Sequence, residues 1–346
     1  MLFPILLSAI KQIASTSLTV HSRVRAGLIP ALFAILLAVS VHTRAQGVPM
    51  PATADASDMK LGSVLVFNYY TSGAANPGAE NTRVSLTNHG AANATVHMFL
   101  IDGATGATAD FYACLAAKQT QVFNASDMDP GISGYILAVA TTRDGCPISH
   151  NALSGEAAVK LSTGHFGTLP AVAIAAVAAT PVDACAADSA TLLFDGVKYN
   201  RLPHQLSVDK LPSAADGNQG LLILNRLGGA LQNVVPGIGS FTGSLYDASG
   251  AASSFTASGG AQFRGTFGVA NFPAVPGGFS GVIPAGATGW MKLGNNATVP
   301  LLGAVFNFNA NTATNATAFT GARNLRHLAL SSFAALTIPV RVSVCQ

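Results

Sequence analysis

The stretch Thr82-Arg-Val-Ser-Leu-Thr87 alternates polar and apolar side chains. Because successive side chains of a β-strand point to opposite faces, this alternation is typical of a strand with one buried face. Upstream lies Ser63-Val-Leu-Val-Phe-Asn-Tyr-Tyr70, which is rich in the β-branched and aromatic residues that favour strands. Downstream lies Thr95-Val-His-Met-Phe-Leu-Ile101, which ends at the turn dipeptide Asp102-Gly103. Many short strands at this spacing predict an all-β fold.

The second half of the chain repeats the order of the first half. Gly220-Leu-Leu-Ile-Leu-Asn225 corresponds to residues 82–88, and Gly289-Trp-Met-Lys-Leu293 corresponds to residues 134–138. The order is kept while the spacings vary, which predicts two diverged copies of one β-module. We therefore expect two tandem immunoglobulin-like antiparallel β-sandwich domains after a signal peptide.

Five parts are expected along the chain. They are a signal peptide at residues 1–45, a flexible lead-in at 46–60, a first β-sandwich domain at 61–168, an apolar linker at 169–185 and a second β-sandwich domain at 186–346. The linker is bounded by prolines and too short for a membrane helix, so we expect a buried strand or a short helix there. The second domain is expected to open at residues 191–199 and to close at 336–344.

The first 45 residues have the features of a secretory signal. Arg23 and Arg25 precede an apolar run over residues 26–41, and the small residues Thr43 and Ala45 follow it. A positive flank, an apolar centre and small residues predict cleavage after Ala45. The protein is then secreted, either extracellular or periplasmic, with no stable membrane span after cleavage. An uncleaved N-terminal anchor is the alternative reading.

The charge of the chain is low and uneven. Only 10% of the residues are charged, against about 25% in an average soluble domain. Four of the 18 basic residues lie in residues 1–45, which contain no acidic residue, so the rest of the chain has 14 basic and 15 acidic residues and a net charge of −1. A nearly neutral mature chain without a basic cluster excludes nucleic acid as a partner.

The chain contains four cysteines, Cys114, Cys146, Cys185 and Cys345. An even number in an exported protein predicts two disulfides. Three connectivities are possible. We expect Cys114–Cys146, which closes a loop in the first half, and Cys185–Cys345, which ties the start of the second half to the C-terminus. No Cys/His spacing indicates a metal site.

No motif in the sequence identifies an enzyme or a cofactor. Gly278-Phe-Ser-Gly281 places Ser280 one residue short of the G-x-S-x-G elbow of a serine hydrolase. The glutamates are Glu80 and Glu156 alone, and most aspartates stand beside Gly, Ala or Ser in turns. His97 lies within an apolar strand, where a packed histidine is the expected role. We therefore expect neither catalysis nor a bound cofactor.

The segment Asp127-Met-Asp-Pro-Gly-Ile-Ser133 is a weak candidate for a calcium site. Asp127, Asp129 and Ser133 alternate oxygen-bearing side chains around a glycine turn, as Ca²⁺ ligands do. The segment lacks the third acid and the distal glutamate of an EF-hand loop. A simple Asp-Pro-Gly turn between strands explains it equally well.

Several stretches resemble a group of secreted bacterial proteins described only as hypothetical. The resemblance rests on Glu80-Asn-Thr-Arg83, residues 124–135, Phe194-Asp-Gly-Val-Lys-Tyr-Asn-Arg-Leu-Pro203 and Ala214-Ala-Asp-Gly-Asn218, in the same order over most of the chain. It implies export and an all-β fold. It supplies no activity and no catalytic residue.

Two functions are consistent with these observations. The first is a non-enzymatic secreted or cell-surface protein with a structural, adhesive or binding role towards a surface polymer, a glycan or a protein. The second is an extracytoplasmic hydrolase or carbohydrate-binding protein with a site built from loops. A cleft in which Asp and His side chains converge favours the second function, and a smooth surface with exposed strand edges favours the first.

Overall fold

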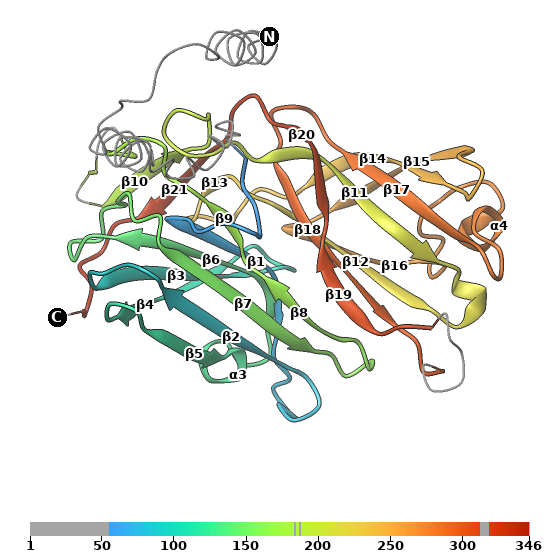
Figure 1. Cartoon of the computed structure of the whole chain (residues 1–346), viewed down its shortest axis with the longest axis horizontal. Helices are drawn as coiled ribbons and strands as arrows, with labels where there is room; N and C mark the ends of the chain where they lie inside the picture. Colours follow the sequence, from blue (N-terminus) through green and yellow to red (C-terminus); the bar gives the residue numbers. More distant parts are fainter. Residues whose placement is uncertain (1–54, 183–184, 187, 312–317, 346) are drawn as a thin grey trace, which may run out of the picture. The chain divides into compact units, whose positions relative to one another are not determined.

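The computed structural model describes residues 55–182, 185–186, 188–311 and 318–345 (Figure 1). The predicted signal peptide and residues 46–54 of the predicted lead-in lie outside these ranges. Strands dominate the described chain, which confirms the all-β prediction. No helix in the described ranges is long and apolar enough to cross a membrane.

Residues 64–174 form two sheets, which we call the first sheet pair (Figure 1). One sheet has the order β4-β3-β6-β1-β9 and the other β5-β2-β7-β8, with every pairing antiparallel. The elements are β1 (Val64–Thr71), β2 (Asn81–Asn88), β3 (Ala94–Asp102), β4 (Thr108–Leu115), β5 (Thr120–Asn124), α3 (Ala125–Met128), β6 (Ser133–Thr141), β7 (Leu153–Lys160), β8 (Phe166–Pro170) and β9 (Val172–Ile174).

Residues 203–330 form the second sheet pair. Its sheets have the orders β15-β14-β17-β11-β20 and β16-β12-β18-β19, again with antiparallel pairings. The elements are β11 (Pro203–Pro212), η1 (Ala214–Asp216), β12 (Gln219–Arg226), β14 (Gly239–Tyr246), β15 (Ala252–Gly259), β16 (Gln262–Thr266), α4 (Gly278–Val282), β17 (Thr288–Gly294), β18 (Leu301–Phe308), β19 (Gly321–Asn324) and β20 (Arg326–Leu330).

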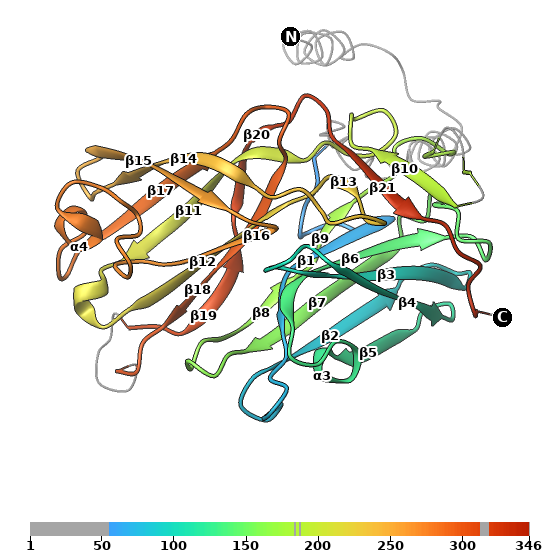
Figure 2. The same ribbon diagram turned by 180° about the vertical axis from the view of Figure 1, so that it is seen from behind.

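A third, small sheet of order β10-β21-β13 covers the first sheet pair (Figure 2). Its strands are β10 (Ser189–Leu193), β13 (Gly229–Ala230) and β21 (Ala335–Pro339), and β13 runs parallel to β21. The strands expected to open and close the second domain therefore pair with each other in this sheet. The expected boundary at residue 168 falls inside β8, and the expected linker contains β9, which completes the first five-stranded sheet.

Strand β1 is buried along its whole length because both of its faces are covered. Leu65 and Phe67 point into the core between the two sheets of the first pair. Val64 and Val66 point the other way, into a core shared with the small sheet. A strand covered on both faces needs no polar side, which explains its nearly continuous apolar sequence. Strand β2, in contrast, alternates between buried and more exposed positions, as its sequence predicts.

The immunoglobulin-like order that we expected is not confirmed. In an immunoglobulin domain the first two strands lie in one sheet. Here β1 pairs with β6 and β9, while β2 lies in the opposite sheet between β5 and β7.

The two sheet pairs have the same strand order when β1–β9 are set against β11, β12 and β14–β20. A β-bulge interrupts β1 between Phe67 and Tyr70, and another interrupts β11 between Val208 and Leu211, at the corresponding position. A bulge adds a residue to one strand and redirects the side chains beside it. Asn68 and Asp209 therefore occupy equivalent places in the two pairs.

The sheet β16-β12-β18-β19 is covered on both faces and joins the two sheet pairs. Leu222 and Leu224 of β12 pack into the core of the second pair. Leu221 and Ile223 of the same strand pack into the core of the first pair. The two sheet pairs therefore share one buried interface rather than being connected by a free linker.

A chain of buried amides crosses this interface. The side chain of Asn68 is fully buried and donates to the carbonyl oxygen of Gly303 (3.1 Å). Asn225 Nδ2 donates to the Asn68 carbonyl oxygen (2.8 Å), and Gln262 Nε2 donates to Asn225 Oδ1 (2.8 Å). Buried polar groups need such partners, because an unpaired one costs about 1–3 kcal/mol.

We expect the Asn68→Ala substitution to lower the free energy of unfolding by about 2–4 kcal/mol, since it removes the hydrogen bonds that the Asn68 side chain donates to Gly303 and Asn324 and leaves a void. Denaturant titration measures this value. The exposed Asn233 provides the control, and Asn233→Ala should change the free energy by less than about 0.5 kcal/mol. Equal effects of the two substitutions would contradict the buried network.

The disulfides are Cys114–Cys345 and Cys146–Cys185, with Cα–Cα distances of 5.4 and 5.8 Å. The pairing that we expected is therefore wrong, although all four cysteines are bonded as predicted. The reason is the path of the C-terminal segment. After β21 this segment returns to the first sheet pair, where Tyr112 donates to the carbonyl oxygen of Arg341 (2.6 Å). Cys345 is thereby placed beside β4.

The two disulfides should differ in their effect on stability. Cys114–Cys345 spans 231 residues and Cys146–Cys185 spans 39. Loop-closure entropy then assigns about 5 kcal/mol to the longer link and about 4 kcal/mol to the shorter one. Replacing Cys114 and Cys345 by Ser should therefore lower the free energy of unfolding more than replacing Cys146 and Cys185. The reverse ranking, or a Cys114–Cys146 peptide in a non-reducing digest, would refute this.

Candidate functional site

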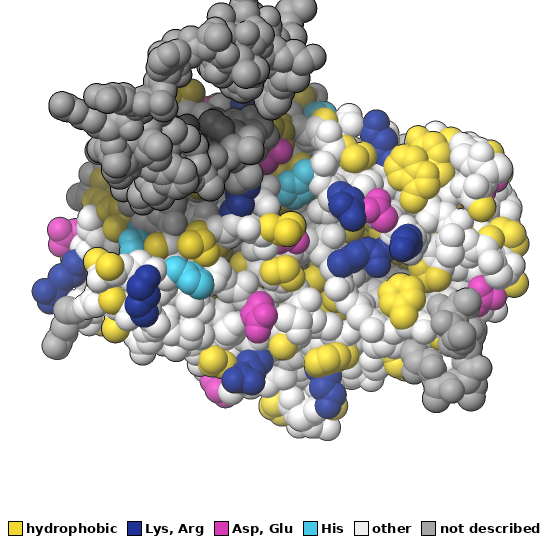
Figure 3. All heavy atoms as spheres, viewed as in Figure 1, with side chains coloured by type: hydrophobic (Ala, Val, Ile, Leu, Met, Phe, Trp, Pro, Cys, Tyr) yellow, Lys and Arg dark blue, Asp and Glu magenta, His cyan; other side chains and the backbone are white. Residues whose placement is uncertain are grey.

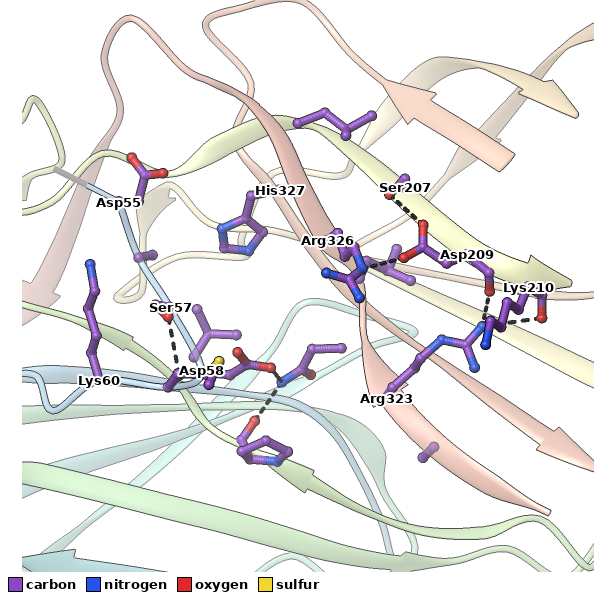
Figure 4. Close-up of a pocket in the computed structure, with 18 residues that line it drawn as sticks. Asp55, Ser57, Asp58, Lys60, Ser207, Asp209, Lys210, Arg323, Arg326 and His327 are labelled. Carbon is purple, nitrogen blue, oxygen red and sulfur yellow. Dashed lines mark hydrogen bonds and ion pairs between the residues drawn. The ribbon is translucent and has the colours of Figure 1, made fainter. Parts of the chain in front are cut away.

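A groove of about 850 Å³ opens where the two sheet pairs meet. Three segments far apart in sequence line it, as Figure 4 shows. Residues 55–60 form one wall before β1, and residues 322–328 of β19 and β20 form the opposite wall. The bulge of β11 closes one end with Ser207, Asp209 and Lys210.

Charge is concentrated in this groove. The whole chain has 18 basic and 15 acidic residues, and seven of these line the groove. They are Asp55, Asp58, Lys60, Asp209, Lys210, Arg323 and Arg326. Most of the same face carries neutral side chains, so the charged cluster stands out on the surface (Figure 3).

The bulge of β11 explains why two successive residues reach the groove. In a regular strand Asp209 and Lys210 would point to opposite faces. The bulge breaks this alternation, and Lys210 adopts a φ of 49°, in the left-handed region that non-glycine residues rarely occupy. Both residues therefore line the groove.

Asp209 connects the bulge of β11 to the neighbouring strands β19 and β20. Its carboxylate forms an ion pair with Arg326 and accepts from Ser207 Oγ (3.2 Å). The Arg323 guanidinium donates to the Asp209 carbonyl oxygen. Burial lowers the pKa of Arg323 below its usual range, and the nearby Asp209 opposes this change. The two arginines thus hold the bulge in a fixed position.

Asn324 connects the groove to the amide chain in the interface. Its Nδ2 donates to Asp58 Oδ2 (3.0 Å) and to the Pro170 carbonyl oxygen (2.8 Å). Its Oδ1 accepts from Asn68 Nδ2 (2.9 Å). The wall formed by residues 55–60 is therefore fixed by the same hydrogen bonds that join the sheet pairs.

His327 lies between Asp55 and Asp58 in the groove (Figure 4). Burial lowers the pKa of His327 below its usual value, while the charges of Asp55 and Asp58 and a hydrogen bond to the Ala56 backbone oppose this shift. Burial therefore favours the uncharged form of the ring, which lies between two carboxylates (Figure 4).

Each residue of the predicted calcium site has a hydrogen-bond partner within the protein. Asp127 accepts from Asn124 Nδ2 (3.0 Å), and Asp129 accepts from the Tyr70 hydroxyl (2.6 Å). Ser133 Oγ accepts from the Arg264 guanidinium (2.9 Å). Within the described residues, no three His, Cys, Asp or Glu side chains gather in a way that could hold a metal ion.

His97 is packed in the core, as its apolar surroundings predict. Its ring stacks on Tyr112 with centroids 4.2 Å apart, and its Nε2 lies 2.8 Å from Asp110 Oδ2. Asp110 also forms an ion pair with Arg341 (3.1 Å). Burial lowers the pKa of His97. This group anchors the C-terminal segment and lies outside the groove lining.

Sequence analysis did not identify the groove. Asp209 and Lys210 are adjacent charged residues in the strand Pro203–Pro212, and Arg323 and Arg326 stand three residues apart near the C-terminus. In a chain with so few charges these two local clusters were the available signal. Nothing in the sequence indicates that they meet.

The comparisons with known proteins assign no function to the groove. No protein-family model and no curated protein sequence matches the chain. A Thermotoga maritima protein, 1070, aligns in structure with 32% of this chain and 91% of its own at 7% identity, with a TM-score of 0.25. A deletion mutant of Bacillus subtilis oxalate decarboxylase OxdC aligns with 73% of this chain and 70% of its own at 11% identity, with a TM-score of 0.17. Likenesses this low assign no function.

We expect the histidine in the groove to titrate below its usual pKa of about 6.5. Because the folded-state pKa is the lower one, protonation favours the unfolded chain, and the free energy of unfolding falls as the pH drops below about 6.5. NMR titration of His327 measures the pKa directly. Asp58→Asn should lower it further, since the attraction of that carboxylate for the protonated ring is lost. The exposed control Asp127→Asn should leave it unchanged, and a pKa above 6.5 would refute the assignment.

Proposed function

We propose that this protein is an extracytoplasmic binding protein that holds a polar ligand in the groove between its two sheet pairs. One observation carries the proposal: seven charged side chains of a chain with 10% charged residues line one groove of about 850 Å³. Charged residues cost free energy to gather unless they serve a partner or pair with one another. A groove of this size accommodates a ligand of small-molecule or oligomer size.

Binding fits the groove better than catalysis. Asp58 and Asp209 are already engaged by Asn324 and Arg326, which hold both carboxylates in place. The two serines of the groove are also engaged, because Ser57 Oγ accepts from a backbone amide and Ser207 Oγ donates to Asp209. In a serine–histidine arrangement the nucleophile donates to a histidine instead. The arrangement therefore supports recognition.

A hydrolase is the second candidate, and one observation favours it. A loop-built hydrolase site is expected to be a cleft with converging Asp and His side chains, and His327 lies between Asp55 and Asp58 in the groove (Figure 4). A neutral histidine is in the form required of a general base. Hydrolysis of a bound ligand, lost in His327→Gln, would favour this candidate.

The proposal includes export and two copies of one β-sandwich module. Two disulfides support an oxidising compartment outside the cytoplasm. The equal strand orders and the equivalent bulges in β1 and β11 support a duplication. The resemblance to secreted bacterial proteins fits export. Fractionation of the producing cell, with N-terminal sequencing of the exported protein, tests cleavage after Ala45.

A binding panel tests the groove. The purified protein is applied to immobilised acidic polysaccharides, neutral polysaccharides and extracellular-matrix proteins. We expect retention by one class, and Arg326→Gln should weaken it roughly tenfold, as loss of one charged hydrogen bond does. Arg143→Gln is the matched control, because Arg143 is exposed and outside the groove. No retention by any class, or equal retention by all variants, would overturn the proposal.

A further inference from the structure

Two aromatic side chains stand beside the groove on the outer face of the sheet β15-β14-β17-β11-β20. Tyr246 of β14 and Trp290 of β17 are cross-strand neighbours, and their rings stack with centroids 4.0 Å apart and an interplanar angle of 3°. Trp290 is 37% exposed. We call these two residues the aromatic wall. An aromatic pair fixed in this way offers a rigid surface at little entropic cost.

The strand register places the aromatic wall at the end of the groove. Val208 pairs with Met291 and Leu211 pairs with Gly289, so Trp290 lies opposite the bulge between them. Met291 is buried in the core, and Trp290 therefore points to the outer face. The bulge residues Asp209 and Lys210 line the groove. Trp290 is thus a cross-strand neighbour of the bulge that closes one end of the groove, and it lies just outside the groove lining itself.

A row of hydroxyl and basic side chains crosses the same face beside the aromatic wall. Ser244 pairs with Lys292, and Lys292 pairs with Ser207. Ser207 in turn pairs with Arg326, whose side chain is 77% exposed. Together with Ser254, which pairs with Ser244, the row spans the five strands of the sheet. Ser207 is buried and donates to Asp209, so the donors of the row that reach the surface are Ser244, Ser254, Lys292 and Arg326.

The charges at this end of the groove are mainly positive. Lys210, Lys292 and Arg326 face one acid, Asp209, whose carboxylate is already paired with Arg326. Asp55 and Asp58 lie on the far wall, towards His327 (Figure 4). A ligand at the aromatic end therefore meets an aromatic face, hydroxyl groups and excess positive charge.

We infer that the groove and the aromatic wall bind an acidic polysaccharide, with a uronic acid ring against Trp290 and its carboxylate towards Lys210 and Arg326. Sugar rings carry apolar C–H faces that pack on aromatic rings and hydroxyl groups that need polar partners, which is the combination present here. A planar guanidinium suits a carboxylate. This inference rests on the proposed function and names its ligand class.

Trp290 makes the test direct, because it is the only tryptophan in the chain. Tetragalacturonic acid is titrated into the wild-type protein while tryptophan fluorescence is recorded. We expect a saturable change in intensity that weakens with added salt, since part of the attraction is electrostatic. Cellotetraose tests a neutral sugar, and tetraglutamate tests a polyanion without sugar rings. A response to tetraglutamate equal to that to tetragalacturonic acid, or a stronger response to cellotetraose, would overturn the acidic-sugar assignment.

Variants distinguish failure of this inference from failure of the proposed function. By calorimetry, Trp290→Ala should weaken tetragalacturonic acid binding roughly tenfold, and Tyr246→Ala should weaken it less. Phe166→Ala is the matched control, because Phe166 is a 54% exposed aromatic residue in β8 outside the groove lining. Thermal melts verify that each variant is folded. If Arg326→Gln weakens binding and Trp290→Ala does not, the aromatic wall is refuted while the groove stands. If the wild-type protein binds no member of the binding panel, both proposals fail.

Discussion

The buried amide of Asn68 is the contact on which the joint between the two sheet pairs depends. It donates to Gly303 and to Asn324, and its backbone oxygen accepts from Asn225. Inside an apolar interface these bonds are strong, and each unmade one is costly. The sheet pairs can therefore dock only in the register that satisfies them. Hydrophobic contacts at the same interface are less directional, since apolar side chains tolerate small shifts.

The hydrogen bonds that join the two sheet pairs also hold the walls of the groove in place. Asn324 continues the amide chain to Asp58, so the wall before β1 is held at a fixed distance from the wall formed by β19 and β20. A preformed site loses little conformational entropy when a ligand binds. The seven charged side chains of the groove thus lie where hydrogen bonds between the sheet pairs already hold the backbone in place.

The equivalent β-bulges in β1 and β11 have different roles in the two sheet pairs. In β1 the bulge turns Asn68 and Tyr69 into the interface, where both are fully buried. In β11 the corresponding bulge turns Asp209 and Lys210 to the surface, where they line the groove. The backbone geometry is similar, and the difference lies in what covers it. The first bulge is covered by the second sheet pair, while the second remains open beside Trp290.

The sequence by itself determined the elements that depend on local pattern. The alternation in residues 82–87 predicted β2, and the even number of cysteines predicted that all four are bonded. Other features depend on contacts between residues far apart in the sequence. The pairing of Cys114 with Cys345 depends on the return of the C-terminal segment to the first sheet pair, and the groove depends on contacts such as that between Asp58 and Asn324, which are 266 residues apart. Side-chain periodicity reports which face of a strand is buried, but not which strand covers it, because that choice is made by long-range packing and hydrogen bonding. Tertiary structure alone therefore decided where the few charges of this chain converge.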